Sequence, residues 1–212
     1  MEKQEEVDQQ EGKKEFDIKK VIERLSAKSP KLAEVFKKVK IAKQVGGTAA
    51  ADDQEITYNP EYMAKLTEAG QDFVMAHEAL HIELEHVTAD NAEFDDKDLL
   101  NIAYDAQINS ILIEKVGMSP PKSGVFIAGA HEFDIKQVYH ILKTRKEAGQ
   151  PVTDMNEEMR KEILKKQGKN VDVDEMEGVE PGSHHKWDAA RERAKKKAAE
   201  AKKAPEAKLE RL

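Results

Sequence analysis

The five residues His77-Glu78-Ala79-Leu80-His81 constrain the fold of this chain more than any other stretch. They lie in an apolar window whose polar residues recur at helical rather than strand spacing. On a helix, His77 and His81 are one turn apart and project from the same face, so both imidazoles can bind one zinc ion. Glu78 lies about 100° round from His77, where its carboxylate reaches a water on that ion. The motif therefore predicts a helix with a hydrolytic zinc site, and the alternative is a surface helix with two incidental histidines.

The absence of cysteine narrows the ligands that such a site can use. Disulfides and thiolate ligands are excluded, which leaves histidine, aspartate and glutamate. With 39% hydrophobic and 36% charged residues among 212, we expect one domain with a modest core and solvated extensions. The charged N-terminus predicts no secretory signal, and no stretch approaches the ~18 apolar residues of a membrane span. A cytoplasmic protein without a membrane anchor is expected.

Changes in composition divide the chain into four segments. We predict a disordered or frayed arm over 1–15, a folded domain over 16–145, a flexible acidic loop over 146–183 and a basic helical extension over 184–212. The net charge is −7, but ten Lys or Arg stand against five Asp or Glu between Lys186 and Leu212. A basic helix can contact nucleic acid, yet interleaved acids are typical of a solvated helix, so a nucleic-acid partner is not expected.

The folded domain is predicted to be mostly helical, with a small antiparallel sheet directly before the motif helix. One-sided apolar stripes indicate helices, and short alternating runs indicate strands. The expected elements are helices over 16–27 and after Ser29-Pro30, and strands over 40–45, 48–51 and 55–58. Asn59-Pro60 then opens a helix that ends at Gly70, and the motif helix runs to about Val87. This order predicts the α+β class.

The predicted sheet has two alternative roles. An exposed edge strand beside the metal can hold an extended peptide by backbone pairing. The other interpretation is that the sheet only covers the core, and the sequence does not decide between the two.

A catalytic zinc ion needs a third protein ligand besides the two histidines. Asp105 lies 24 residues after His81, on a helix predicted from Asp98 to about Lys115, which is a normal arrangement for a carboxylate ligand. Asn101 and Asn109 share its face, one turn to either side, and could orient the ligands. Asparagine is unfavourable inside a helix, so a packed polar site explains this face better than a solvated one. The weaker rivals for the third ligand are Glu85, Asp95 and Glu114.

His86 is not expected to bind the metal. The metzincin pattern requires a glycine three residues and a histidine six residues after the second motif histidine, and this chain has Leu84 and Val87 there. If the helix continues, His86 also points about 180° away from His77. A structural or supporting role is therefore predicted for it.

A peptidase also needs a donor for the oxyanion of its transition state. The candidates are His184, His185, Tyr104 and Tyr139. His184 and His185 are preferred, although their segment would have to fold back over the site.

The sequence resembles the metallopeptidase domain of bacteria and their phages that is usually joined to a von Willebrand factor A-like domain and encoded near MoxR-type AAA ATPases. The stretches that carry the resemblance are 47–50, 56–60, 77–81 with His86, 101–109, and His184 and His185 with Trp187. The resemblance implies a zincin-like fold over 16–145, zinc held by His77, His81 and Asp105, and Glu78 as the catalytic residue. It also implies an AAA ATPase or a von Willebrand factor A-like protein as a partner.

The expected function is zinc-dependent hydrolysis of a peptide bond in a peptide or protein substrate, with Glu78 as general base and then general acid. The alternative is a catalytically silent, zinc-stabilised binding or scaffold module that acts with a protein partner. A third interpretation is a regulatory or antidefence accessory whose peptidase activity is restricted to one target. The presence of Glu78 favours hydrolysis, because a structural zinc ion needs no general base.

Overall fold

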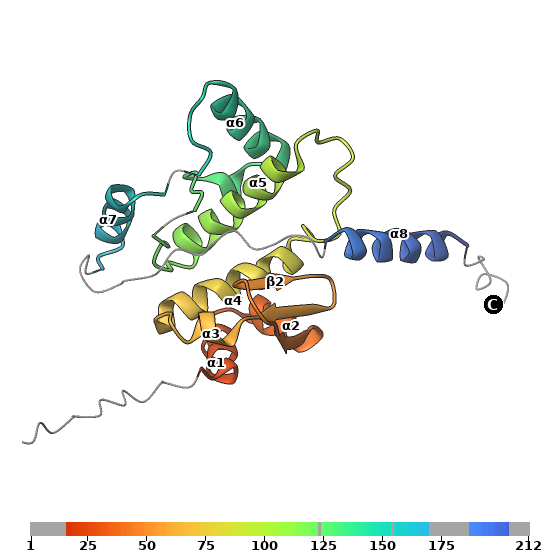
Figure 1. The fold of residues 1–212 in the computed structure, drawn as a ribbon, viewed down its shortest axis with the longest axis horizontal. Coiled ribbons are helices and arrows are strands. Elements are labelled where there is room, and N and C mark those ends of the chain that lie inside the picture. The colour runs from red at the N-terminus through yellow and green to blue at the C-terminus, as the bar shows by residue number, and fades with distance from the viewer. Residues whose placement is uncertain (1–15, 123, 154, 170–186, 204–212) are drawn as a thin grey trace, which may run out of the picture.

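The computed structural model describes residues 16–122, 124–153, 155–169 and 187–203, which form a mostly helical α+β fold as predicted. Helix α4 (Glu68–Glu83) runs through its middle, with the sheet and two N-terminal helices on one side and α5 on the other (Figure 1). Every residue of α4 from Asp72 to His81 is buried. A helix buried all round belongs to the core rather than to the surface, so the motif helix is the centre of the molecule.

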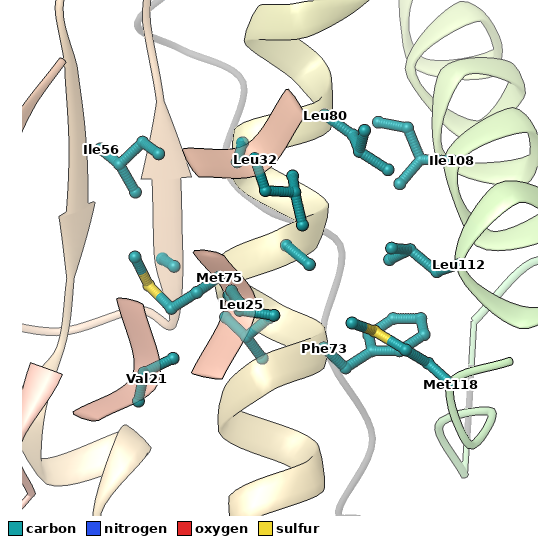
Figure 2. Close-up of a cluster of buried hydrophobic side chains, with 14 of the residues drawn as sticks. Val21, Leu25, Leu32, Ile56, Phe73, Met75, Leu80, Ile108, Leu112 and Met118 are labelled. Carbon is teal, nitrogen blue, oxygen red and sulfur yellow. The ribbon is translucent and has the colours of Figure 1, made fainter. Parts of the chain in front are cut away.

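Helices α1 (Ile18–Lys28) and α2 (Pro30–Lys38) form where the one-sided stripes predicted them. The predicted cap is confirmed, because the Ser29 hydroxyl accepts a hydrogen bond from the Leu32 amide at 3.4 Å and Pro30 occupies the first turn. Figure 2 shows Leu25 and Leu32 of these helices against α4, with Ile108 and Leu112 on its other side. Apolar burial therefore holds α4 from both sides.

The sheet has three strands in the order β1-β3-β2, and its bounds are β1 (Lys40–Lys43), β2 (Ala49–Ala51) and β3 (Glu55–Tyr58). Strand β3 pairs antiparallel with β2 but parallel with β1. The predicted antiparallel sheet is therefore wrong in one pairing, and the sheet is mixed. A tight turn at 52–54 reverses the chain between β2 and β3. The link at 44–48 leaves room for one strand between β1 and β2, and β3 occupies that place. Strands β1 and β2 are the two edges.

Two predicted helix ends differ from the structure. Helix α3 (Pro60–Met63) is a single turn, opened by Asn59 as predicted. Gly70 does not end it, because Thr67 caps α4 and its hydroxyl accepts a hydrogen bond from the Gly70 amide at 3.2 Å. Gly70 thus belongs to the first turn of α4, and α4 ends before Val87.

The second half of the chain is helical. Its elements are α5 (Lys97–Ser110), the π-helix η1 (Ile111–Lys115), the 3₁₀ turn η2 (Ala130–Glu132), α6 (Ile135–Glu147), α7 (Glu157–Lys166) and α8 (Trp187–Lys203). Among the described residues, no helix is long and apolar enough to cross a membrane. Helix α8 lies within the extension predicted over 184–212, whose residues 184–186 and 204–212 are outside the described structure.

Helix α7 forms inside the segment predicted as a flexible loop, so that prediction is wrong for 157–166. Leu164 is fully buried, and the Arg160 guanidinium donates to the Pro120 carbonyl at 3.2 Å. The charged composition of the segment concealed these two anchoring residues. The rest of that segment from 170 to 183, and the arm predicted over 1–15, lie outside the described residues.

Two clusters of buried apolar side chains meet where α4 packs against α5. The larger cluster surrounds α4 and includes Phe73 and Leu80. The smaller one joins α5 to α6 and includes Tyr104 and Trp187. The polar residues of the motif helix lie at this junction.

Candidate metal centre

The structure brings together three buried side chains that could hold a metal ion, His77 and His81 of α4 and Asp105 of α5. Nε2 of His77 lies 3.1 Å from Nε2 of His81, and the two nitrogens lie 3.3 and 3.2 Å from Oδ1 of Asp105. At bond lengths of about 2.0–2.1 Å to zinc, two corners of a tetrahedron lie about 3.3–3.4 Å apart. The three atoms therefore match one face of a tetrahedral zinc site within a few tenths of an ångström.

The spacing of the motif produces this arrangement directly. The two histidines are four residues apart on one helix, so their rings project from one face of α4. Asp105 faces them because the apolar residues of α5 pack against the cores on either side of it. Relative exposures of 5% for His77, 0% for His81 and 4% for Asp105 place the donors in a low-dielectric interior. Two neutral imidazoles and one carboxylate would balance half of the charge of a divalent cation there.

Asn109 determines which nitrogen of His77 can bind a metal. The Asn109 Nδ2 group donates to the Val125 carbonyl at 2.9 Å, which leaves its Oδ1 as an acceptor 3.1 Å from Nδ1 of His77. Nδ1 of a neutral His77 therefore carries the proton, and the lone pair is on Nε2, toward Asp105. The predicted supporting role of Asn109 is consistent with this contact.

His86 contacts the site because α4 stops earlier than predicted. Glu85 adopts a left-handed φ of 58°, and the His86 amide bonds back to the His81 carbonyl at 3.0 Å, as in a Schellman helix end. The chain therefore reverses, and Nδ1 of His86 lies 3.3 Å from Nδ1 of His81. The expectation that His86 points away from the site is wrong, since it assumed a helix that continues. Its ring also stacks on Tyr104, with centroids 4.0 Å apart.

The two histidines of α4 have pKa values that move in opposite directions. Burial lowers the pKa of His77, but the hydrogen bond and charge of Asp105, with the charge of Glu78 and the Asn109 contact, raise it overall. Burial also lowers the pKa of His81, and the nearby His77 lowers it further, so it lies well below its usual value. Asp105 thus favours the protonated form of His77, whereas burial favours the neutral form of His81. A metal binds an imidazole only in its neutral form, so it would have to displace any proton on Nε2 of His77.

Glu78 follows His77 on α4 and is not one of the grouped donors. It is 5% exposed, and its charge contributes to the raised pKa of His77. A buried carboxylate next to a ligand is a candidate general base.

The other predicted residues lie elsewhere or are not described. Asn101 is half-buried and makes no hydrogen bond with the three donors in the described part of the chain. The preferred oxyanion candidates, His184 and His185, lie outside the described residues. The Tyr104 hydroxyl donates to Asn91 at 2.8 Å, and that of Tyr139 donates to Asp95.

The three rival ligands are also placed away from the donors. Glu85 is exposed at the end of α4, and Asp95 is bound by Tyr139 and Lys143 at the surface. Glu114 accepts a hydrogen bond from the Gly129 amide at 2.9 Å, at the η2 turn. Among the predicted carboxylates, only Asp105 joins the two histidines in the described structure.

The sequence did not predict that Trp187 would contact the histidines of α4. The indole of Trp187, at the start of α8, packs edge-on to the His81 ring with centroids 4.9 Å apart. Trp187 is 106 residues from His81, and only the three-dimensional structure shows that they touch.

Comparison with known families matches residues 13–212 to a family described as "Putative metallopeptidase domain". The match covers the three donors, Glu78 and the helix that begins at Trp187. No curated protein and no solved structure matches the chain.

Proposed function

Because the chain belongs to this metallopeptidase family, we propose that it hydrolyses peptide bonds with one zinc ion held by His77, His81 and Asp105. The observation that carries the proposal is the near-equilateral triangle of donors, with sides of 3.1 to 3.3 Å. Family membership implies a metal, and the chemistry of the donors favours zinc, since two imidazoles and one carboxylate are a common catalytic set. A zinc ion bound there would lower the pKa of a water to about 7 and polarise the scissile carbonyl.

Glu78 performs the proton transfers in this proposal. Its carboxylate takes the proton of the attacking water and later gives it to the amine of the leaving peptide. Asp105 and Asn109 have a different task, because they hold the imidazoles so that each Nε2 faces the same point. Asn109 fixes the tautomer, and Asp105 supplies the negative charge that a cation needs.

An extended segment of a peptide or protein is the proposed substrate. Strand β2 is an edge strand, and α4 packs against it, so its outer side runs past the helix that bears the histidines. A peptide paired with that edge would present its backbone carbonyls near the metal centre.

The burial of the donors favours the alternative of a silent scaffold, because none of the three is more than 5% exposed. The two readings differ in one measurement. We expect cells that produce the wild-type chain to contain new protein termini that are absent from cells producing Glu78→Gln at equal abundance. Identical sets of termini in the two samples, and again when both chains also carry Arg193→Ala, would reject the peptidase and leave the zinc-stabilised scaffold.

Asn109→Ala is expected to weaken zinc binding by about 10- to 100-fold, because His77 then loses the acceptor that fixes its tautomer. A competition titration with a chromogenic chelator measures this affinity. Asn101→Ala is the matched control, since Asn101 shares the helix face but makes no hydrogen bond with the donors in the described part of the chain. Equal affinities for the two variants would show that Asn109 does not orient His77.

A further inference from the structure

The first turn of α8 packs on the metal centre and on the sheet at the same time. The Trp187 ring contacts His81, and its indole N–H donates to the Ala51 carbonyl of β2 at 3.0 Å. Trp187 is 2% exposed and Ala190, one turn later, is fully buried. The start of α8 is therefore seated against both elements rather than merely adjacent to them.

The hydrogen-bonding pattern shows that the backbone N–H and C=O groups of Ala51 point to the outer edge of β2, away from β3. Bonds join Asn59 to Thr48 and Asp52 to Glu55, so these are the hydrogen-bonded pairs of the β2–β3 ladder. Alternation in an antiparallel ladder then directs the backbone groups of Ala51 away from β3. The indole thus occupies an acceptor on the free edge of β2, which is the edge proposed above for the substrate.

An ion-pair cluster holds the next turn of α8 to the same end of the sheet. The Arg193 Nε group lies 3.0 Å from Asp53, and its Nη2 group lies 3.2 Å from Asp52. Both aspartates belong to the turn that follows β2. We call Trp187 and Arg193 the α8 clasp, because between them they bind the last residue of β2 and the turn after it.

The remainder of α8 makes little contact with the molecule. Residues 195–199 are exposed, and the helix projects away from the other elements (Figure 1). A cavity of about 420 Å³ separates its near side from the loop before α5; residues lining it include Asn91, Lys97 and Ala194. The part of α8 beyond its first two turns therefore adds little to the contacts that hold the helix to the sheet.

We propose that the α8 clasp is an autoinhibitory contact that closes the β2 edge and the metal centre until α8 is displaced. The inference rests on the proposed function, since a closed edge matters only where a peptide must enter. When Trp187 leaves, its ring no longer covers His81, and the Ala51 carbonyl can accept a hydrogen bond from an incoming peptide. The proposal explains both why the three donors are buried and why a helix that otherwise projects from the molecule packs on them at its first turn.

The chain has one tryptophan, so its indole N–H gives a single proton signal for the clasp. Arg193→Ala is expected to speed the exchange of that proton with solvent about two- to fivefold, as loss of a partly exposed ion-pair cluster would allow. The amide of Met75 in α4 should exchange as in the wild type, which separates opening of the clasp from unfolding. Lys197→Ala is the matched control, because it removes one charge from an exposed position of the same helix.

A second readout tests whether the clasp covers the metal centre. Arg193→Ala loaded with zinc should release it to an excess of chelator faster than the wild type by the same factor. Arg193→Lys should keep both rates closer to the wild type than Arg193→Ala does, since it retains a positive charge beside Asp52 and Asp53.

Unchanged indole exchange in Arg193→Ala overturns the clasp. Faster exchange with unchanged zinc release also overturns it, because the metal centre would then not lie behind Trp187. A chain that binds no zinc contradicts the proposed function instead. The indole exchange of Arg193→Ala and Arg193→Lys then still decides whether the clasp exists.

Discussion

His81→Ala is expected to abolish stoichiometric zinc binding, whereas the wild-type chain purified without chelator should contain about one zinc ion per chain. His81 supplies one corner of the donor triangle, and the two donors that remain cannot complete a three-ligand site. Loss of a ligand should weaken binding by more than the 10- to 100-fold typical of a supporting contact. Elemental analysis and zinc titration measure this directly.

His81 is fully buried, so its loss also leaves a cavity in the core. Asp105→Asn separates the two effects, because it keeps the shape of the side chain and removes only its charge. That variant should also lose zinc and remain folded. His140→Ala, at an exposed position of α6, should bind zinc as the wild type does. A metal-free wild type, or full occupancy in Asp105→Asn, would contradict the proposed centre.

Glu78→Gln is expected to lower the cleavage rate about 10²- to 10⁴-fold and to leave zinc content and stability unchanged. The amide matches the carboxylate in shape but cannot accept the proton of the attacking water. Since Glu78 is not among the grouped ligand atoms, the metal should stay in place. A purified target from the comparison of protein termini supplies the substrate for this rate.

Glu83→Gln is the control for Glu78→Gln, because it makes the same chemical change at an exposed position of the same helix. Its rate should equal that of the wild type. A Glu78→Gln enzyme that cleaves as fast as this control would reject Glu78 as the proton carrier, even if zinc is present.

The parts of the fold that follow from local chemistry were predictable. Ser29-Pro30 and Asn59-Pro60 open helices where caps and first-turn prolines are favoured, and the α+β class followed from periodicity alone. The parallel pairing of β1 with β3 was not predictable, because it depends on how the chain passes between strands rather than on any strand's residues.

For the donors too, what depends on local helix geometry was predictable and what depends on the path of the chain was not. His77 and His81 are related by helix geometry, and Asp105 was found by its spacing from asparagines on its own helix. Only the direction of His86 was mispredicted, because it depends on a backbone reversal at Glu85, a non-glycine residue with positive φ that no simple rule anticipates. The packing of Trp187 on His81 depends on the whole tertiary structure.

The position of the donors at the junction of two apolar clusters has a consequence for the amount of protein in a cell. A metal bound between α4 and α5 would bind the folded chain and not the unfolded one, so it would add about 2.7 kcal/mol to stability at a free concentration a hundred times the dissociation constant. Proteases degrade chains in proportion to the time they spend open. The lifetime of this protein would therefore follow the supply of metal, independently of any substrate.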